Sequence, residues 1–161
     1  MTNIPGTQWP LYESFTENKQ LQDNLSKFSK NKLAPDVENI FRALELTNPE
    51  DVKVIIIGQD PYQTPGVANG LAFSSYNRMT PSLKTIFAEL EFEYGTRRFE
   101  TDLTSWAEQG VLLLNTILTT ELGTSLAHIN FGWQDFTREV VRYVLNLGSP
   151  ISVLLWGRHA Q

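Results

Sequence analysis

Three side chains have the types and the sequence context to form a site for a flat heterocyclic base. Asp60 and Asn115 each follow a run of apolar residues, and Phe73 lies in the segment after Asp60. An amide both donates and accepts hydrogen bonds, and an aromatic ring stacks on a planar ring. A crevice that joins a carboxylate, an amide and an aromatic face therefore indicates recognition of a heterocycle, with the carboxylate available for chemistry.

The same residues also have ordinary structural interpretations. Asp before Pro is common in turns, and Asn is common where a strand ends. Phe73 would serve equally well as a core residue on spacing alone. Ser82 falls in the first turn of a predicted helix, where exposed N–H groups favour a phosphate, although capping alone explains it too. Residue types and spacing therefore favour a ligand crevice and leave its reaction open.

The elements that must position these residues are strands and helices in alternation. Apolar, largely β-branched or leucine-rich runs predict three strands: Val52–Ile57 as a buried central strand, Val111–Leu114 as a second buried strand, and Ile151–Trp156 as a third strand. Start signals and apolar spacing predict three helices, which begin at Pro35 and Asp36 (stripe Val37, Ile40, Phe41, Leu44), at Thr80 and Pro81, and near Phe136. This order predicts an α/β fold, a three-layer α/β/α sandwich with a central, mainly parallel sheet.

The predicted topology brings three loops to one edge of the sheet. In open α/β sheets, ligands bind beyond the carboxyl ends of the strands. The three strands lead into residues 58–62, 115–116 and 157–158. We therefore expect Asp60 and Asn115 to share a crevice near Phe73.

Length and composition indicate one globular domain over residues 1–161, with an N-terminal helical segment (1–35) and an α/β core (36–161). The chain has 161 residues, 41% of them hydrophobic and 19% charged. It has no cysteine and two histidines, so we expect no disulfide, no metal and no cofactor. The apolar runs are too short to cross a membrane, and we expect a cytoplasmic protein.

The net charge of −5 opposes attraction to nucleic acid, but the charges are unevenly distributed. No Asp or Glu occurs between Asp60 and Glu89, whereas Arg78 and Lys84 lie in that interval. This gap either marks one non-acidic face of an acidic protein or arises by chance.

Five segments, in order, resemble motifs of the uracil-DNA glycosylases. GQDPYQTPGVANGLAFS (residues 58–74) resembles the water-activating motif of that family, and GVLLLNTILT from Gly110 resembles its uracil-reading strand. The other three are TPSLKTIFAELE, SLAHINFGWQDFT and VLLWGRHAQ, which resemble its phosphate loop, the segment before its long helix and its glycine-serine loop. The resemblance implies a metal-free enzyme of base excision repair, which hydrolyses the N-glycosidic bond of deoxyuridine in DNA and leaves an abasic site.

The resemblance also implies a role for each residue. Asp60 would orient water and stabilise the cationic sugar. Asn115 would pair with the edge of an extruded uracil, Phe73 would stack on it, and Gln59 would contribute backbone contacts. Tyr62 would exclude the methyl group of thymine. Phosphate contacts would come from Gln63, Ser82, Gly157 and Arg158.

The implied partner is uracil-containing DNA, single- or double-stranded, bound by a monomer, and a proteinaceous inhibitor is a further implied partner. Gln63 and Asn69 stand where the family usually has His, and Arg158 stands where it has Ser. The sequence stops at Gln161, before an HPSPLS-like segment that carries the catalytic histidine of the family, and neither His128 nor His159 matches it. We therefore expect an incomplete version of a longer glycosylase. The alternatives are a non-hydrolytic DNA-binding or partner-docking protein and a glycosylase for a different modified base.

Overall fold

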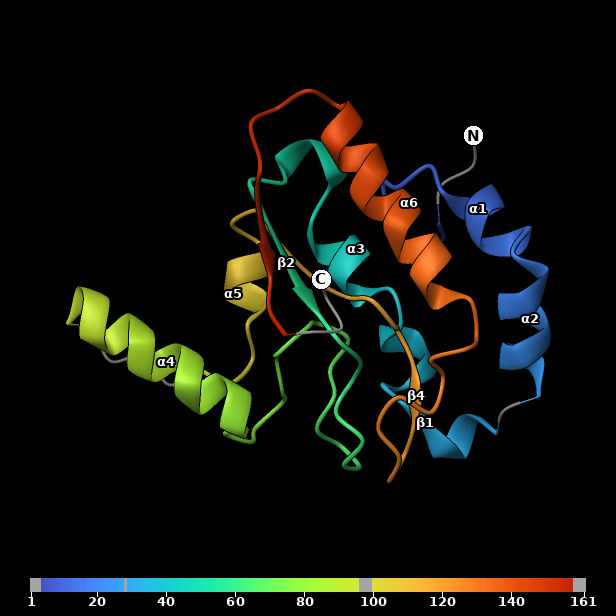
Figure 1. Ribbon diagram of the computed structural model, residues 1–161, viewed down its shortest axis with the longest axis horizontal. Coiled ribbons are helices and arrows are strands. Elements are labelled where there is room, and N and C mark those ends of the chain that lie inside the picture. Colours follow the sequence, from blue (N-terminus) through green and yellow to red (C-terminus); the bar gives the residue numbers. More distant parts are fainter. Residues whose placement is uncertain (1–3, 28, 96–99, 158–161) are drawn as a thin grey trace.

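The computed structural model describes residues 4–27, 29–95 and 100–157 (Figure 1). Its centre is a three-stranded parallel sheet in the order β3-β2-β5. The strands are β2 (Val54–Gly58), β3 (Val111–Asn115) and β5 (Ser152–Leu155). The sheet confirms the three predicted strands to within two residues at each end, and it confirms that the first of them is central. Arg158 and His159, which the sequence analysis named, lie outside the described residues.

The strands form where the sequence supplies continuous apolar runs. Ile55, Ile56 and Ile57 are buried in β2, as expected for a strand that is covered on both faces. In β3 the three leucines at positions 112–114 are buried as well. In contrast, all four residues of β5 are exposed. Burial of the sheet is therefore greatest along β2 and β3, the two strands that lead into Asp60 and Asn115.

Helices lie on both sides of the sheet, as predicted (Figure 1). On one side are α1 (Tyr12–Thr16), α2 (Lys19–Ser26) and α6 (Trp133–Asn146), and on the other are α4 (Pro81–Tyr94) and α5 (Thr104–Ala107). The remaining elements are short: α3 (Arg42–Leu46), the 3-10 turns Lys30–Lys32, Val37–Asn39 and Pro49–Asp51, and an antiparallel pair of β1 (Leu33–Ala34) with β4 (Thr120–Glu121).

The N-terminal segment packs onto the α/β core. Trp9 is fully buried, and its indole Nε1 donates a hydrogen bond of 2.9 Å to the carbonyl of Thr47. Its ring also contacts Tyr143 of α6, with 6.2 Å between the ring centroids. Leu21 of α2 is fully buried too. The predicted N-terminal helical segment therefore packs against the α/β core through Trp9 and Leu21.

The stripe Val37 to Leu44 does not form one helix, contrary to prediction. Ile40 and Phe41 separate a 3-10 turn (Val37–Asn39) from α3, the backbone of Phe41 is not helical (φ −103, ψ 12), and Val37 is exposed. A Cβ atom added to Gly70 would overlap the carbonyl oxygen of Asn39. This turn is therefore shaped by close packing against a distant loop, which hydrophobic periodicity does not report.

Candidate active site

The parallel register places the ends of β2 and β3 side by side. Gly58 lies opposite Asn115. Beyond them, the N–H groups of Thr116 and Ile117 donate to the carbonyls of Gly58 and Gln59, both at 3.0 Å. The Thr116 hydroxyl donates to the Gln59 carbonyl at 2.8 Å. These bonds hold the loop that carries Asp60 against the strand that carries Asn115.

Gly58 is the point where the amide and the aromatic ring converge. A Cβ atom at Gly58 would overlap Asn115 Oδ1 and would lie 3.3 Å from Phe73 Cε2. Real Cβ atoms do not come so close to another side chain. The absence of a side chain at position 58 therefore lets Asn115 and Phe73 approach the same space.

Tyr62 links Phe73 to the start of α4. Its hydroxyl donates a hydrogen bond of 3.0 Å to the Phe73 carbonyl and lies 2.8 Å from the Thr80 hydroxyl. Thr80 is the N-cap of α4, as predicted, because its side chain accepts from the Leu83 N–H. Burial raises the pKa of Tyr62 above its ordinary value, so the phenol keeps its proton and remains a donor.

An open cavity of about 320 Å³ lies between these loops, within the range typical of small-ligand sites. It is lined by eight residues that the sequence analysis assigned to the site: Gln59, Asp60, Tyr62, Gln63, Phe73, Ser82, Asn115 and Gly157. Pro61, Ser125 and Trp156 also line it. The cavity therefore brings together every assigned site residue except Arg158, which lies outside the described residues.

The carboxylate of Asp60 is held by a segment to which the sequence analysis gave no role. One oxygen accepts from the backbone N–H of Leu126 at 2.6 Å, and the other accepts from Gln59 Nε2 at 2.8 Å. The Ser125 hydroxyl lies 3.3 Å from the carboxylate. Leu126 adopts a left-handed backbone (φ 57), which is rare for leucine. The one sequence signal for this contact is that the motif SLAHINFGWQDFT begins at Ser125.

Gln63 and Asn69, the two positions that differ from the usual motif, occupy different environments. Gln63 lines the cavity, and its buried Oε1 has no hydrogen-bond partner among the described residues. Asn69 is fully buried and does not line the cavity. Its amide donates to Ser74 Oγ at 2.8 Å. Asn69 is therefore placed behind the cavity, next to residues such as Gly70 and Ser74 that lie close to Phe73 and Asn115.

His128 is a core residue, away from the cavity lining. It is fully buried, its Nδ1 lies 2.8 Å from the Thr119 hydroxyl, and its ring stacks on Phe131 with 3.9 Å between centroids. Burial lowers the pKa of His128 from 6.5 to about 4. The imidazole is therefore neutral in the folded protein near pH 7.

This lowered pKa predicts a pH-dependent stability. Between about pH 6.5 and pH 4 the unfolded chain binds a proton at His128 that the folded chain does not bind. The stabilisation is therefore complete above pH 6.5 and decreases as the pH falls toward 4, by about 1.4 kcal/mol per pH unit. Urea unfolding of the protein and of His128→Gln from pH 7 to pH 5 measures the effect. We expect the slope to be weaker in the variant, and equal slopes would contradict the assignment.

Two further features concern metals and membranes. Within residues 4–27, 29–95 and 100–157, no group of three or more His, Cys, Asp or Glu side chains could hold a metal ion. In the same part of the chain, no helix has the length and apolar character needed to cross a bilayer.

Comparison with known proteins identifies relatives over most of the chain. Residues 44–161 match the family model of the uracil DNA glycosylase superfamily. A uracil-DNA glycosylase from Idiomarina loihiensis is 47% identical over 79% of this chain, and one from Bacillus mycoides is 42% identical over the whole chain. The chain spans 61% of the length of the first relative and 75% of the second.

Solved structures share this fold. The crystal structure of mimivirus uracil-DNA glycosylase superposes with a TM-score of 0.81 at 30% identity, covering 91% of this chain and 58% of that one. A variant of the mimivirus protein in complex with UGI gives a TM-score of 0.83 at 28% identity, over 96% of this chain and 64% of that one. These matches confirm the predicted α/β class, and the motif order, the cavity and the relatives agree that this chain belongs to the uracil-DNA glycosylase superfamily.

Proposed function

We propose that this protein excises uracil from DNA by hydrolysing the N-glycosidic bond, which leaves an abasic site. The observation that carries the proposal is the convergence of the Asn115 amide and the Phe73 ring over Gly58, beside the Asp60 carboxylate. A cavity of about 320 Å³ has room for one base, and a base must leave the helical stack to enter it.

In this proposal the chemistry belongs to Asp60. As the glycosidic bond breaks, positive charge develops on the sugar, and a fixed carboxylate stabilises that charge. The bonds from Leu126 and Gln59 orient Asp60 before the substrate arrives. The carboxylate also orients the water that attacks the sugar. The position of Asp60 therefore affects both the breaking of the glycosidic bond and the attack of water.

The remaining cavity residues bind substrate. Asn115 pairs with the polar edge of uracil, because one amide supplies both a donor and an acceptor. Phe73 stacks on the base, Tyr62 excludes the methyl group of thymine, and Gln59 adds backbone contacts. Flanking phosphates contact a separate set of groups: the first turn of α4 at Ser82, the Gln63 amide, Gly157 and Arg158.

The test is release of free uracil from a single-stranded uracil oligonucleotide in the presence of a chelator. We expect Asn115→Ala to lower the rate by at least about 10²-fold, since the base loses its preorganised hydrogen bonds. Asn146→Ala, at the exposed end of α6, is the matched control and should leave the rate unchanged. Equal rates for the protein and Asn115→Ala would contradict the assignment. Salt-sensitive DNA binding without uracil release would favour the non-hydrolytic alternative.

We also propose that residues 1–161 form a single domain, which the packing of Trp9 and Leu21 in the core supports. In this proposal the domain acts as a monomer. Uracil-containing DNA is the proposed partner, and the mimivirus variant bound to UGI supports a proteinaceous inhibitor as a second one. The proposed location is the cytoplasm.

A further inference from the structure

The conformation of Phe73 requires support from its neighbours. Its backbone is left-handed (φ 64), which costs about 1–3 kcal/mol for a residue other than glycine and persists only where the surrounding structure holds it. This conformation brings the ring to within 5.3 Å of the Trp156 ring, measured between centroids, and next to Gly58. The groups that fix residues 69–74 therefore decide where the stacking face lies.

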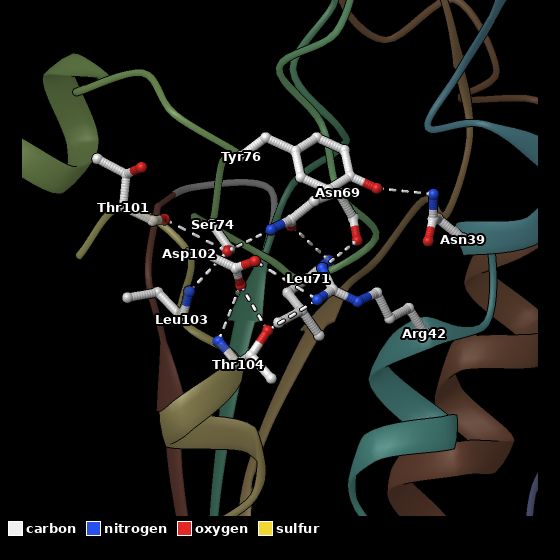
Figure 2. Close-up of polar contacts among 10 residues, drawn as sticks. All are labelled: Asn39, Arg42, Asn69, Leu71, Ser74, Tyr76, Thr101, Asp102, Leu103 and Thr104. Atoms are coloured by element: carbon white, nitrogen blue, oxygen red, sulfur yellow. Dashed lines mark hydrogen bonds and ion pairs between the residues drawn. The ribbon is translucent and has the colours of Figure 1, made fainter.

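The Asn69 side chain clamps the loop on both sides of Phe73. Its Oδ1 accepts from the Leu71 N–H at 3.3 Å, and its Nδ2 donates to Ser74 Oγ at 2.8 Å. Figure 2 shows the amide between these two residues. One buried amide thus closes the turn that contains Phe73.

Ser74 then ties this turn to the segment before α5. Its hydroxyl is fully buried, accepts from the Leu103 N–H at 2.9 Å and donates to the Thr101 carbonyl at 3.4 Å. Together with the bond from Asn69, these contacts use the one donor and both acceptor positions of a hydroxyl. A change at Asn69 would therefore leave Ser74 with an unfilled acceptor position in a buried site.

Arg42, at the start of α3, fixes Asn69 from outside the loop. Its Nη1 donates to the Asn69 carbonyl at 3.0 Å, and its Nη2 donates to Thr104 Oγ1 at 2.8 Å (Figure 2). The Asp102 carboxylate lies 3.5 Å from Nη2, and the Tyr76 ring lies 6.0 Å from the guanidinium carbon. The Arg42 side chain is only 18% exposed. A planar guanidinium can make these contacts together, whereas the point charge of lysine cannot.

We propose that Arg42 and Asn69 are positioning residues that hold the Phe73 ring in place for stacking, although neither lines the cavity. The inference rests on the proposed function, because it assigns the ring the task of stacking on a base. The inference goes beyond that function because it assigns the orientation of the stacking ring to residues outside the cavity, namely the polar network of Arg42, Asn69 and Ser74.

The test separates the position of the ring from binding of uracil. In Asn69→Leu and Arg42→Lys we expect the NMR cross-peaks between the Phe73 and Trp156 rings to weaken, and the affinity for free uracil to fall about tenfold. Affinity for an oligonucleotide without uracil should stay unchanged. A variant that had lost its fold would bind that oligonucleotide more weakly as well. Arg138→Lys, in an exposed pair with Asp135, is the control for Arg42→Lys. It should change neither the ring cross-peaks nor the affinity for free uracil.

A double substitution tests whether Asn69 acts on uracil binding through the Phe73 ring. In a Phe73→Ala background, Asn69→Leu should cause no further loss of uracil affinity, because the two residues act through one ring. Unchanged ring cross-peaks in both Asn69→Leu and Arg42→Lys would overturn the inference, as would additive losses in the double variant. Failure of the unmodified protein to bind uracil would instead contradict the proposed function, and the ring cross-peaks would still decide the positioning role.

Discussion

Asp60→Asn should lower the rate of uracil release by about 10²–10³-fold while the protein remains folded. The asparagine side chain has nearly the same size, and its Oδ1 can still accept from the Leu126 N–H. It carries no charge, so it cannot stabilise the positive charge that develops on the sugar. The rate of release from a single-stranded uracil oligonucleotide measures the effect, with thermal unfolding as the check on folding.

A matched control distinguishes this effect from a general change in charge. Asp135 lies on α6 with 71% of its side chain exposed, in a surface pair with Arg138. Asp135→Asn makes the same chemical change outside the cavity and should leave the rate within about twofold, as exposed pairs contribute little. The role assigned to Asp60 would be wrong if the two variants released uracil equally fast.

Gly58→Ala should reduce uracil release by about 10²-fold through geometry alone, because displacement of catalytic or binding groups by about 1 Å has effects of that size. The new Cβ atom would overlap Asn115 Oδ1 and lie 3.2 Å from the Ala72 Cβ. The Asn115 amide would have to move from the space it shares with Phe73. Affinity for free uracil and the release rate should therefore both fall.

Gly66→Ala serves as the control for this substitution. Gly66 has a left-handed backbone (φ 70), and a Cβ there would have no atom within 4 Å. Its replacement should lower the free energy of unfolding by about 1 kcal/mol without changing uracil affinity. If Gly58→Ala bound uracil as tightly as Gly66→Ala does, the close approach at Gly58 would have no part in the site.

The sequence predicts the sheet and the cavity well because both depend on local signals. Apolar runs define β2 and β3, and the end of each run marks where Asp60 and Asn115 emerge. The parallel register then brings these ends together, as the rule for open α/β sheets requires. Phe73 joins them through a left-handed turn that spacing alone does not reveal.

The features that the sequence analysis missed depend on contacts between distant segments. Leu126 donates to Asp60 across 66 positions of the chain, and Arg42 reaches Thr104 across 62. No periodic pattern encodes such pairs. The break before α3 has the same origin, because Asn39 packs closely against the glycine at position 70. The motif marks Asn69 only as a departure from the usual His, whereas the structure shows that its buried amide closes the turn that contains Phe73.

The position of free uracil in a crystal of this protein is the most direct test of the central claim. We predict that the base lies flat against the Phe73 ring, with its polar edge within hydrogen-bond distance of the Asn115 amide and the Asp60 carboxylate nearby. A uracil bound elsewhere on the molecule, with this cavity empty, would contradict the account.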